Sequence, residues 1–223
     1  MIKNKIIVVI PAYNEEKTII EIINKVKPLV NEIVVVDDGS SDQTAQLAEQ
    51  QGVTVLRHLI NRGQGAALQT GNQYALEKGG EIIVHFDADG QFLAEEIKDI
   101  VQPLEQGEAE VVFGSRFLEK KSEIPWFKRQ IIIPLAHLAN KLIIGFSLTD
   151  PQSGFRALSK RAVQVIQIEN DGMAHCSEIL YKVFKNNFKI KEVPITVIYH
   201  DFGQCFGGGI KIIKDLFLAK LMD

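Results

Sequence analysis

The sequence predicts an α/β fold with a mostly parallel central sheet and helices on both of its faces. Three observations support this prediction. Short apolar runs alternate with amphipathic helical patterns through the first half of the chain. This alternation is typical of parallel strands, because each strand needs a helix to cross back to the start of the next. The chain has 223 residues, enough for one large α/β domain. Acidic residues follow several of the apolar runs, where such sheets bind ligands.

The first half of the chain contains five predicted strands with four helices between them. The first helix buries a face rich in isoleucine. A capping-box spacing from Ser40 to Gln43 predicts the start of the second helix, with Asp42 as the alternative cap. The predicted strands cover residues 5–10, 32–36, 53–57, 81–86 and 110–113, and the predicted helices cover residues 15–27, 40–51, 65–78 and 93–105.

The second half is less regular. We predict strands at 153–158 and 188–198, and helices at 160–168, 176–187 and 210–221. The apolar stretch at 130–148 is interrupted by polar residues and a proline, so we expect a one-sided helix and no membrane span. This helix would pack on the protein's own core or lie on a membrane surface. The glycines at 207–209 suggest a mobile loop, for which a lid is one use.

The composition is that of an ordinary globular protein. The net charge of −3 gives no bulk attraction to nucleic acid. Cys176 and Cys205 form no metal-ligand spacing, and we expect free thiols in a reducing compartment. Without a signal pattern we expect a cytoplasmic protein, with a peripheral position at the inner membrane face as a second option. We expect one domain over residues 1–223 without a transmembrane segment.

The most informative stretch follows the predicted strand at 81–86. Side chains two residues apart on an extended segment point the same way, so Asp87 and Asp89 can converge on one point. With the amide oxygen of Gln91 they form a hard, all-oxygen ligand set that suits Mg²⁺ or Mn²⁺. The simpler alternative is a loop acid pair that caps the next helix.

Other polar groups follow the earlier strands. Pro11–Glu15 stands where a dinucleotide fold needs its glycine motif, which argues against a nicotinamide or flavin site. Asp38 can accept hydrogen bonds from a ribose or a base, or Asp37 beside it can simply stabilise the turn. Arg62 begins a glycine-rich loop that favours phosphate, although small residues there can also serve close helix packing.

Cations and acids in the later segments are candidates for an acceptor site. Arg116 closes the fifth predicted strand and offers a forked donor for phosphate. Arg129 precedes the apolar helix, and surface solvation is its simpler role. Asp150 and Glu178 are candidate general bases, and Glu178 can equally be a helix-surface acid.

Together these motifs resemble family 2 inverting glycosyltransferases with the GT-A nucleotide-diphospho-sugar transferase fold, a Rossmann-like three-layer sandwich. Within that family the chain is similar to the dolichyl- and polyprenyl-phosphate mannosyltransferase branch. The resemblance runs from about Ile6 to Lys214, and its markers are 11–15, 37–42, 62–71, 87–91, 114–116 and 149–156. It implies transfer of a hexose from a UDP- or GDP-sugar, with Mg²⁺ or Mn²⁺, to a polyprenyl phosphate in cell-envelope glycan synthesis.

The resemblance also implies roles for individual positions. The nucleoside would contact Pro11, Ala12, Tyr13, Glu15 and Asp38; the metal and diphosphate would contact Asp87, Asp89 and Gln91; and the acceptor phosphate would contact Arg116 and Arg129. Membrane-bound relatives carry C-terminal transmembrane helices, and we expect none in this sequence, so peripheral membrane contact or a membrane partner is expected. Relatives often place an arginine in the loop at 200–205, where His200 or Gln204, or Lys211 beyond it, would have to substitute.

Three alternatives remain open at this point. A soluble glycosyltransferase could act on a glycan or small-molecule hydroxyl, and it would need Asp150 or Glu178 as its base. A non-catalytic nucleotide-sugar-binding subunit could regulate a membrane partner. A nucleotidyltransferase would also use metal and nucleotide, but a lysine-bearing glycine loop after the first strand is missing.

Overall fold

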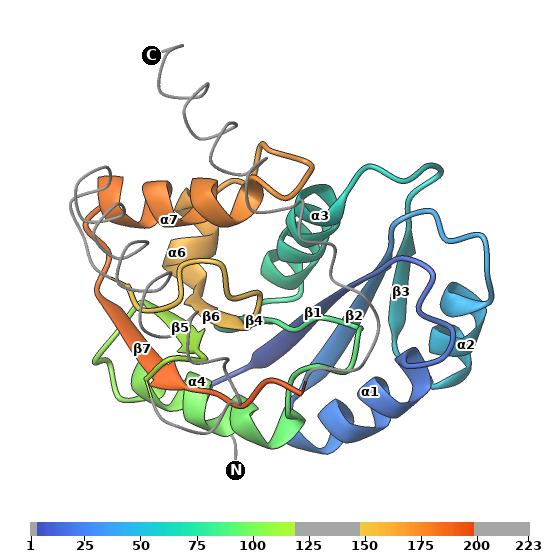
Figure 1. The fold of residues 1–223 in the computed structure, drawn as a ribbon, viewed down its shortest axis with the longest axis horizontal. Coiled ribbons are helices and arrows are strands. Elements are labelled where there is room, and N and C mark those ends of the chain that lie inside the picture. Colours follow the sequence, from blue (N-terminus) through green and yellow to red (C-terminus); the bar gives the residue numbers. More distant parts are fainter. Residues whose placement is uncertain (1–3, 119–147, 199–223) are drawn as a thin grey trace, which may run out of the picture.

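The computed structural model describes residues 4–118 and 148–198. These residues form a sheet in the order β3-β2-β1-β4-β6-β5-β7, with helices on both faces (Figure 1). The strands are β1 (Ile6–Ala12), β2 (Glu32–Asp37), β3 (Thr54–Arg57), β4 (Ile82–His85), β5 (Val111–Ser115), β6 (Arg156–Ser159) and β7 (Ile190–Pro194). Strand β1 pairs in parallel with β2 and β4, β2 with β3, and β5 with β7. The prediction of a mostly parallel sheet is confirmed.

The two faces of the sheet are covered because side chains alternate along each buried strand. On one face Val8 and Ile10 join a core with α1 (Ile19–Val26), α2 (Thr44–Gln50) and α4 (Ile97–Glu105). On the other face Ile7 and Val9 join a core with α3 (Gln64–Glu77), α6 (Lys160–Val165) and α7 (His175–Lys185). Two short 3₁₀ helices, η1 (Lys27–Leu29) and η2 (Ala94–Glu96), complete the described elements. Figure 1 shows α3, α6 and α7 on one side of the sheet and α1 and α4 on the other.

Strand β6 runs against its neighbours. It is antiparallel to both β4 and β5, with Arg156 opposite His85 on one side and Phe113 on the other. The N-terminal end of β6 therefore lies at the same edge as the carboxyl ends of β4 and β5. This reversal brings the loop at 149–155 to the edge where the Asp87 and Arg116 segments emerge, an arrangement that the local sequence pattern did not predict.

The start of α2 differs from the prediction. The helix begins at Thr44, so the capping box between Ser40 and Gln43 is wrong. The hydroxyl of Ser40 instead accepts a hydrogen bond from the backbone N–H of Asn14 at 2.9 Å. Asp42, the alternative, does accept the backbone N–H of Thr44 at 3.0 Å. The residues before α2 thus tie the β1–α1 turn to the β2–α2 turn.

Other boundaries move by a few residues. Helix α1 begins at Ile19, after a turn in which the Glu15 carbonyl accepts the backbone N–H groups of Thr18 and Ile19. Helix α6 ends at Val165, and β7 covers only 190–194 of the strand expected at 188–198.

None of the described helices is long and apolar enough to cross a membrane. Arg129, nearly all of the apolar helix expected at 130–148, the loop at 200–205, the glycines at 207–209 and the helix expected at 210–221 lie outside the described residues.

Candidate active site

A cleft of about 430 Å³ opens at the carboxyl ends of β1, β2 and β4. Strand β1 lies between β2 and β4 in the sheet. The order of the strands therefore reverses direction at β1, which makes the carboxyl end of β1 a topological switch point. Parallel sheets bind ligands at such switch points. The predicted site residues that line this cleft are Pro11, Ala12, Tyr13, Glu15, Asp38, Asp87, Asp89, Gln91 and Arg116.

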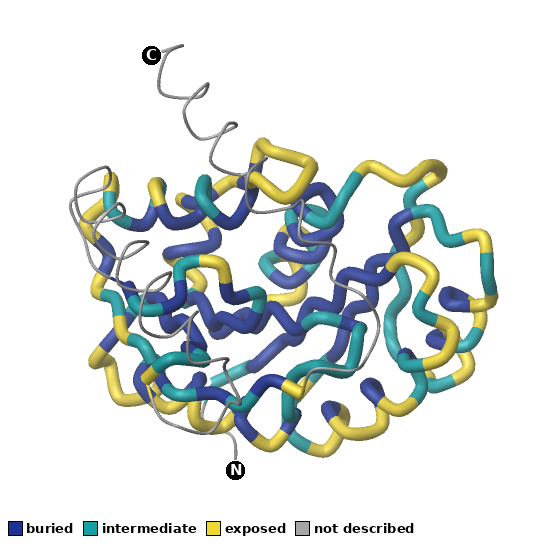
Figure 2. Tube along the Cα trace, viewed as in Figure 1, coloured by how far each residue is buried: buried dark blue, intermediate teal, exposed yellow. Residues whose placement is uncertain are grey.

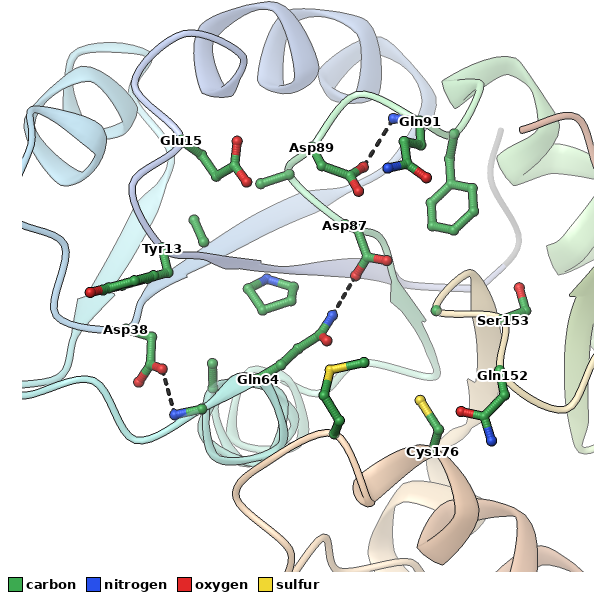
Figure 3. Close-up of a pocket in the computed structure, with 18 of the residues that line it drawn as sticks. Tyr13, Glu15, Asp38, Gln64, Asp87, Asp89, Gln91, Gln152, Ser153 and Cys176 are labelled. Carbon is green, nitrogen blue, oxygen red and sulfur yellow. Dashed lines mark hydrogen bonds between the residues drawn. The ribbon is translucent and has the colours of Figure 1, made fainter. Parts of the chain in front are cut away.

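The acid pair lies just after β4. Figure 3 shows the side chains of Asp87, Asp89 and Gln91 facing the same part of the cleft. Asp87 Oδ1 accepts a hydrogen bond from Gln64 Nε2 at 2.7 Å, and Asp89 Oδ1 accepts the backbone N–H of Gln91 at 3.0 Å. Burial, and after it the charge of Asp89, raises the pKa of Asp87 to about 6. Two carboxylates held this close disfavour each other's charge unless a cation joins them.

This donor set fits a divalent cation. Carboxylate and amide oxygens are the ligands that Mg²⁺ and Mn²⁺ prefer. Within residues 4–118 and 148–198, no group of three or more His, Cys, Asp and Glu side chains could hold a metal. A metal at Asp87 and Asp89 would therefore complete its coordination with amide, water or phosphate oxygens. That incomplete protein ligand set is typical of metals that bind together with a diphosphate.

The loop before β6 packs directly on Asp87. A Cβ atom at Gly154 would lie 2.3 Å from Asp87 Oδ2, closer than any side-chain carbon can sit. Any other residue at position 154 would therefore displace the Asp87 carboxylate. Gly154 packs closely against Oδ2 of Asp87, and Gln64 of α3 donates a hydrogen bond to Oδ1, so the direction of the carboxylate is restricted from two elements.

The end of the cleft beside β1 and β2 combines a flat ring with one buried and one partly buried acid. The half-exposed ring of Tyr13 and the carboxylates of Glu15 and Asp38 line it. Asp38 is buried, and its carboxylate accepts the backbone N–H groups of Arg62 at 3.0 Å and Gly63 at 2.6 Å. These bonds fix the β3–α3 loop along the cleft wall.

Arg116 enters the cleft from the end of β5 and is held by Asp150. Its Nε donates to Asp150 Oδ2 at 2.6 Å, and its Nη2 donates to Oδ1 at 2.8 Å. The Asp150 side chain is 1% exposed, whereas that of Arg116 is 26% exposed. This forked pairing orients the guanidinium and engages both oxygens of the acid. Glu192 supports the loop by accepting the backbone N–H groups of Thr149 and Asp150.

Comparison with known families identifies the chain. The family described as "Glycosyl transferase family 2" matches residues 7–167. The chain belongs to glycosyltransferase family 2. This membership confirms the predicted family and the prediction that the protein is a glycosyltransferase.

Several curated relatives match this family 2 glycosyltransferase over nearly its whole length. An uncharacterized protein of Methanocaldococcus jannaschii is 38% identical, and the match covers 98% of this chain and 93% of the relative. A UDP-N-acetylglucosamine–dolichyl-phosphate N-acetylglucosaminyltransferase of Methanococcus voltae is 34% identical, over 97% and 95% of the two chains. A polyprenol monophosphomannose synthase of Mycolicibacterium smegmatis is 29% identical, over 95% and 84%.

Solved structures share the fold. Glucosyl-3-phosphoglycerate synthase from Mycobacterium tuberculosis, in complex with Mn²⁺, UDP and glucosyl-3-phosphoglycerate, superimposes with a TM-score of 0.76. The match is 22% identical and covers 99% of this chain and 80% of that chain. The same protein in complex with Mg²⁺ and UDP gives a TM-score of 0.75. This likeness confirms the GT-A fold predicted from the sequence.

Besides Asp150, which binds Arg116 from outside the cleft lining, two further predicted residues of the glycosyltransferase lie away from that lining. The Glu178 carboxylate accepts the backbone N–H groups of Glu169 and Asn170 and pairs with Lys182 at 2.8 Å. Although burial raises the pKa of Glu178, these hydrogen bonds and the Lys182 charge hold it below its usual value. The side chain of Arg62 contacts Asp171 at 3.4 Å instead of entering the cleft. In this arrangement Glu178 holds a loop, so its candidacy as a base is not supported by its position.

The structure adds residues that the sequence analysis did not assign. Gln64 donates a hydrogen bond to Asp87, and Cys176 of α7 lines the cleft. The Cys176 sulfur lies 3.3 Å from Arg156 Nη2 and 3.4 Å from His175 Nε2. Although burial raises the pKa of Cys176, the Arg156 charge and the His175 contact lower it to about 7. Cleft membership of α7 depends on how the helix packs, and no local sequence signal predicts it.

Proposed function

We propose that this family 2 glycosyltransferase moves a hexose from a nucleotide-diphosphate sugar onto a polyprenyl phosphate, with inversion at the anomeric carbon and with Mg²⁺ or Mn²⁺. The names of relatives that match the chain over most of its length support the acceptor class. One is a dolichyl-phosphate N-acetylglucosaminyltransferase, and another is a polyprenol monophosphomannose synthase. An undecaprenyl-phosphate mannosyltransferase of Micrococcus luteus is a further relative, at 29% identity.

The observation that carries the proposal is how the candidate bases are engaged. A sugar-hydroxyl acceptor needs a general base in the cleft. Both Asp150 oxygens bind Arg116, and Glu178 holds a loop outside the cleft lining. A lipid phosphate is already anionic near neutral pH and needs a cation instead of a base. Arg116 supplies that cation at the cleft.

The described residues divide the reaction between them. Tyr13 and Asp38 would hold the nucleoside, and Asp87 and Asp89 would hold the metal on the diphosphate. When bound, the metal would stabilise the negative charge that develops on the departing diphosphate. Arg116 would bind the acceptor phosphate. It would direct one phosphate oxygen toward the anomeric carbon, on the face opposite the leaving group.

Structures with the same fold support the choice of cofactor and donor. The mycobacterial glucosyl-3-phosphoglycerate synthase was solved with Mn²⁺ and UDP-glucose, and also with Mg²⁺ and UDP. The acid pair, with its oxygen-only ligand set, is the matching feature in this chain.

Transfer to lipid tests the proposal directly. Labelled UDP- and GDP-sugars are incubated with the enzyme, polyprenyl phosphate in detergent, and either Mn²⁺ or EDTA. We expect label in the organic phase only with metal. The label should be lost in Asp89→Asn and fall sharply in Arg116→Ala, whereas Glu178→Gln, an acid outside the cleft lining, should retain it.

The other outcomes identify the alternatives. Label that moves to a soluble glycan or small molecule, and depends on Asp150 or Glu178, would replace the lipid acceptor with a hydroxyl acceptor. Donor binding without transfer to any acceptor would favour a regulatory nucleotide-sugar-binding role. Either result would overturn the proposed function.

A further inference from the structure

The loop between β3 and α3 exposes two adjacent apolar side chains. Leu59 is fully exposed, and Ile60 is 70% exposed. Isolated exposed apolar residues are common on protein surfaces and need no explanation. Two large aliphatic side chains next to each other at the tip of one loop are a different case, because their exposure to water is unfavourable and burial of both at one surface would be favourable.

This loop is held rigidly from below. The buried Asp38 carboxylate binds the backbone at Arg62 and Gly63 and also contacts His58 Nδ1 at 2.6 Å. A Cβ atom at Gly39 would lie 2.7 Å from the backbone of Ile60, so the loop also packs tightly on the β2–α2 turn. The backbone is therefore fixed in a shape that keeps both apolar side chains in solvent.

A second loop on the same side of the molecule carries another exposed apolar side chain beside the cleft. The backbone N–H of Gly65 donates to the Asp171 carbonyl at 2.7 Å, which joins the start of α3 to the loop at 169–174. Met173 on that loop is 61% exposed and lines the cleft. Figure 2 shows both loops as exposed segments along the same side of the molecule. We call Leu59, Ile60 and Met173 the apolar rim.

Cations flank the apolar rim. The side chains of Arg57 and Arg62 are 57% and 51% exposed. Their ion pairs are long, at 3.7 Å to Asp37 and 3.4 Å to Asp171. Because the whole chain carries a net charge of −3, attraction to an anionic surface must come from such a local group.

We propose that the apolar rim inserts into the surface of an anionic lipid bilayer, with Arg57 and Arg62 among the headgroups, and so holds the cleft against the membrane. This inference rests on the proposed function, since a lipid-borne phosphate must reach the cleft from a membrane. Apolar side chains flanked by arginines match the layered chemistry of a bilayer interface. The neighbouring Asn61 lines the cleft, so insertion places the mouth of the cleft at the headgroups.

Vesicle binding tests the inference without donor, metal or polyprenyl phosphate. The full chain is floated with vesicles of 30% phosphatidylglycerol in phosphatidylcholine, and with phosphatidylcholine alone. We expect binding to the anionic vesicles that weakens with salt. The double variant Leu59→Ser/Ile60→Ser should bind about tenfold or more weakly, from the loss of two apolar side chains. Val165→Ser removes an exposed apolar side chain from α6 and should bind like the wild type.

Three results would overturn the inference. These are no binding of the wild type to anionic vesicles, equal binding of the double variant, and equal loss in Val165→Ser. Binding to native membranes that disappears after protease treatment, without binding to protein-free vesicles, would reassign the rim to a protein partner. A circular dichroism melt of each variant checks that the fold is intact.

Activity separates this inference from the proposed function. The double variant should transfer sugar normally to a short-chain, detergent-free prenyl phosphate and poorly to long-chain polyprenyl phosphate in vesicles. Normal transfer to both acceptors would contradict the membrane role of the rim and leave the proposed function standing. Vesicle binding that depends on the apolar rim, without transfer to any lipid phosphate, would contradict the proposed function and leave the membrane role of the rim standing.

Discussion

Replacing Asp87 with asparagine should stabilise the metal-free protein while destroying its metal site. The side chain is ionised at neutral pH in a place that disfavours its charge, because burial and the nearby Asp89 both raise its pKa. Asparagine has nearly the same shape, keeps an oxygen for the hydrogen bond from Gln64, and carries no charge. The variant therefore removes the unfavourable charge and little else.

The magnitude follows from the pKa. It rises from 3.8 to about 6, and at about 1.4 kcal/mol per pKa unit the ionised form costs about 3 kcal/mol of folding free energy. The folded state holds this proton more tightly than the unfolded state does. The cost is therefore absent below pH 3.8, grows as the pH rises, and is complete above about pH 6. Asp87→Asn should gain up to about 3 kcal/mol at pH 7.5, and the gain should shrink as the pH falls.

Urea and thermal unfolding in EDTA between pH 4.5 and 8 measure this effect. A gain of this size corresponds to a rise in melting temperature of several degrees, up to about 10 °C for a chain of this length. The exposed Asp99→Asn on α4 is the matched control and should change stability by less than about 0.5 kcal/mol. At a concentration a hundred times its Kd, Mn²⁺ should then raise the free energy of unfolding of the wild type by about 2.7 kcal/mol and that of Asp87→Asn far less.

One result would refute the reasoning. If Asp87→Asn melts at or below the wild-type temperature in EDTA at pH 7.5, the ionised carboxylate is not strained in the empty cleft. If neither Mn²⁺ nor Mg²⁺ changes the stability of the wild type, Asp87 and Asp89 do not form a metal site.

Three further predictions concern the supports of the site. Asp150→Asn should lower transfer more than tenfold and destabilise the fold by about 1–3 kcal/mol, because Arg116 loses a buried charged partner; kcat and unfolding measurements check this. Gly154→Ala should weaken Mn²⁺ binding in calorimetry, because the added Cβ would clash with the Asp87 carboxylate. A Cβ at Gly172 would meet open space, so the control Gly172→Ala should bind Mn²⁺ like the wild type. Glu178→Gln should leave kcat within about twofold and cost about 1–2 kcal/mol of stability from weakened loop hydrogen bonds. Its pKa is lowered in the fold, so the wild-type advantage should disappear as the pH falls below 4.5, the usual value; an unchanged advantage at pH 3 would contradict this.

The local pattern of the first half was enough to predict much of the sheet and the cleft. Apolar runs such as 82–84 fill buried strands in a fixed alternation, and a parallel sheet collects the residues that follow them at one edge. This is why Asp38 and the Asp87–Gln91 group could be placed in one site before the fold was known. Helix starts were less predictable, because Ser40 could serve either its own helix or the neighbouring turn, and it serves the turn.

The sequence by itself thus determined the α/β class, the strands and the acids at their ends, because these depend on residues close together in the chain. Only the tertiary structure decided that β6 runs antiparallel between β4 and β5, which sets Gly154 against Asp87 and brings Asp150 to Arg116. It also turned Glu178 toward a loop and brought Cys176 to the cleft. Such pairings join residues far apart in the chain, and the packing energy of the whole fold selects among partners that look equivalent in the sequence.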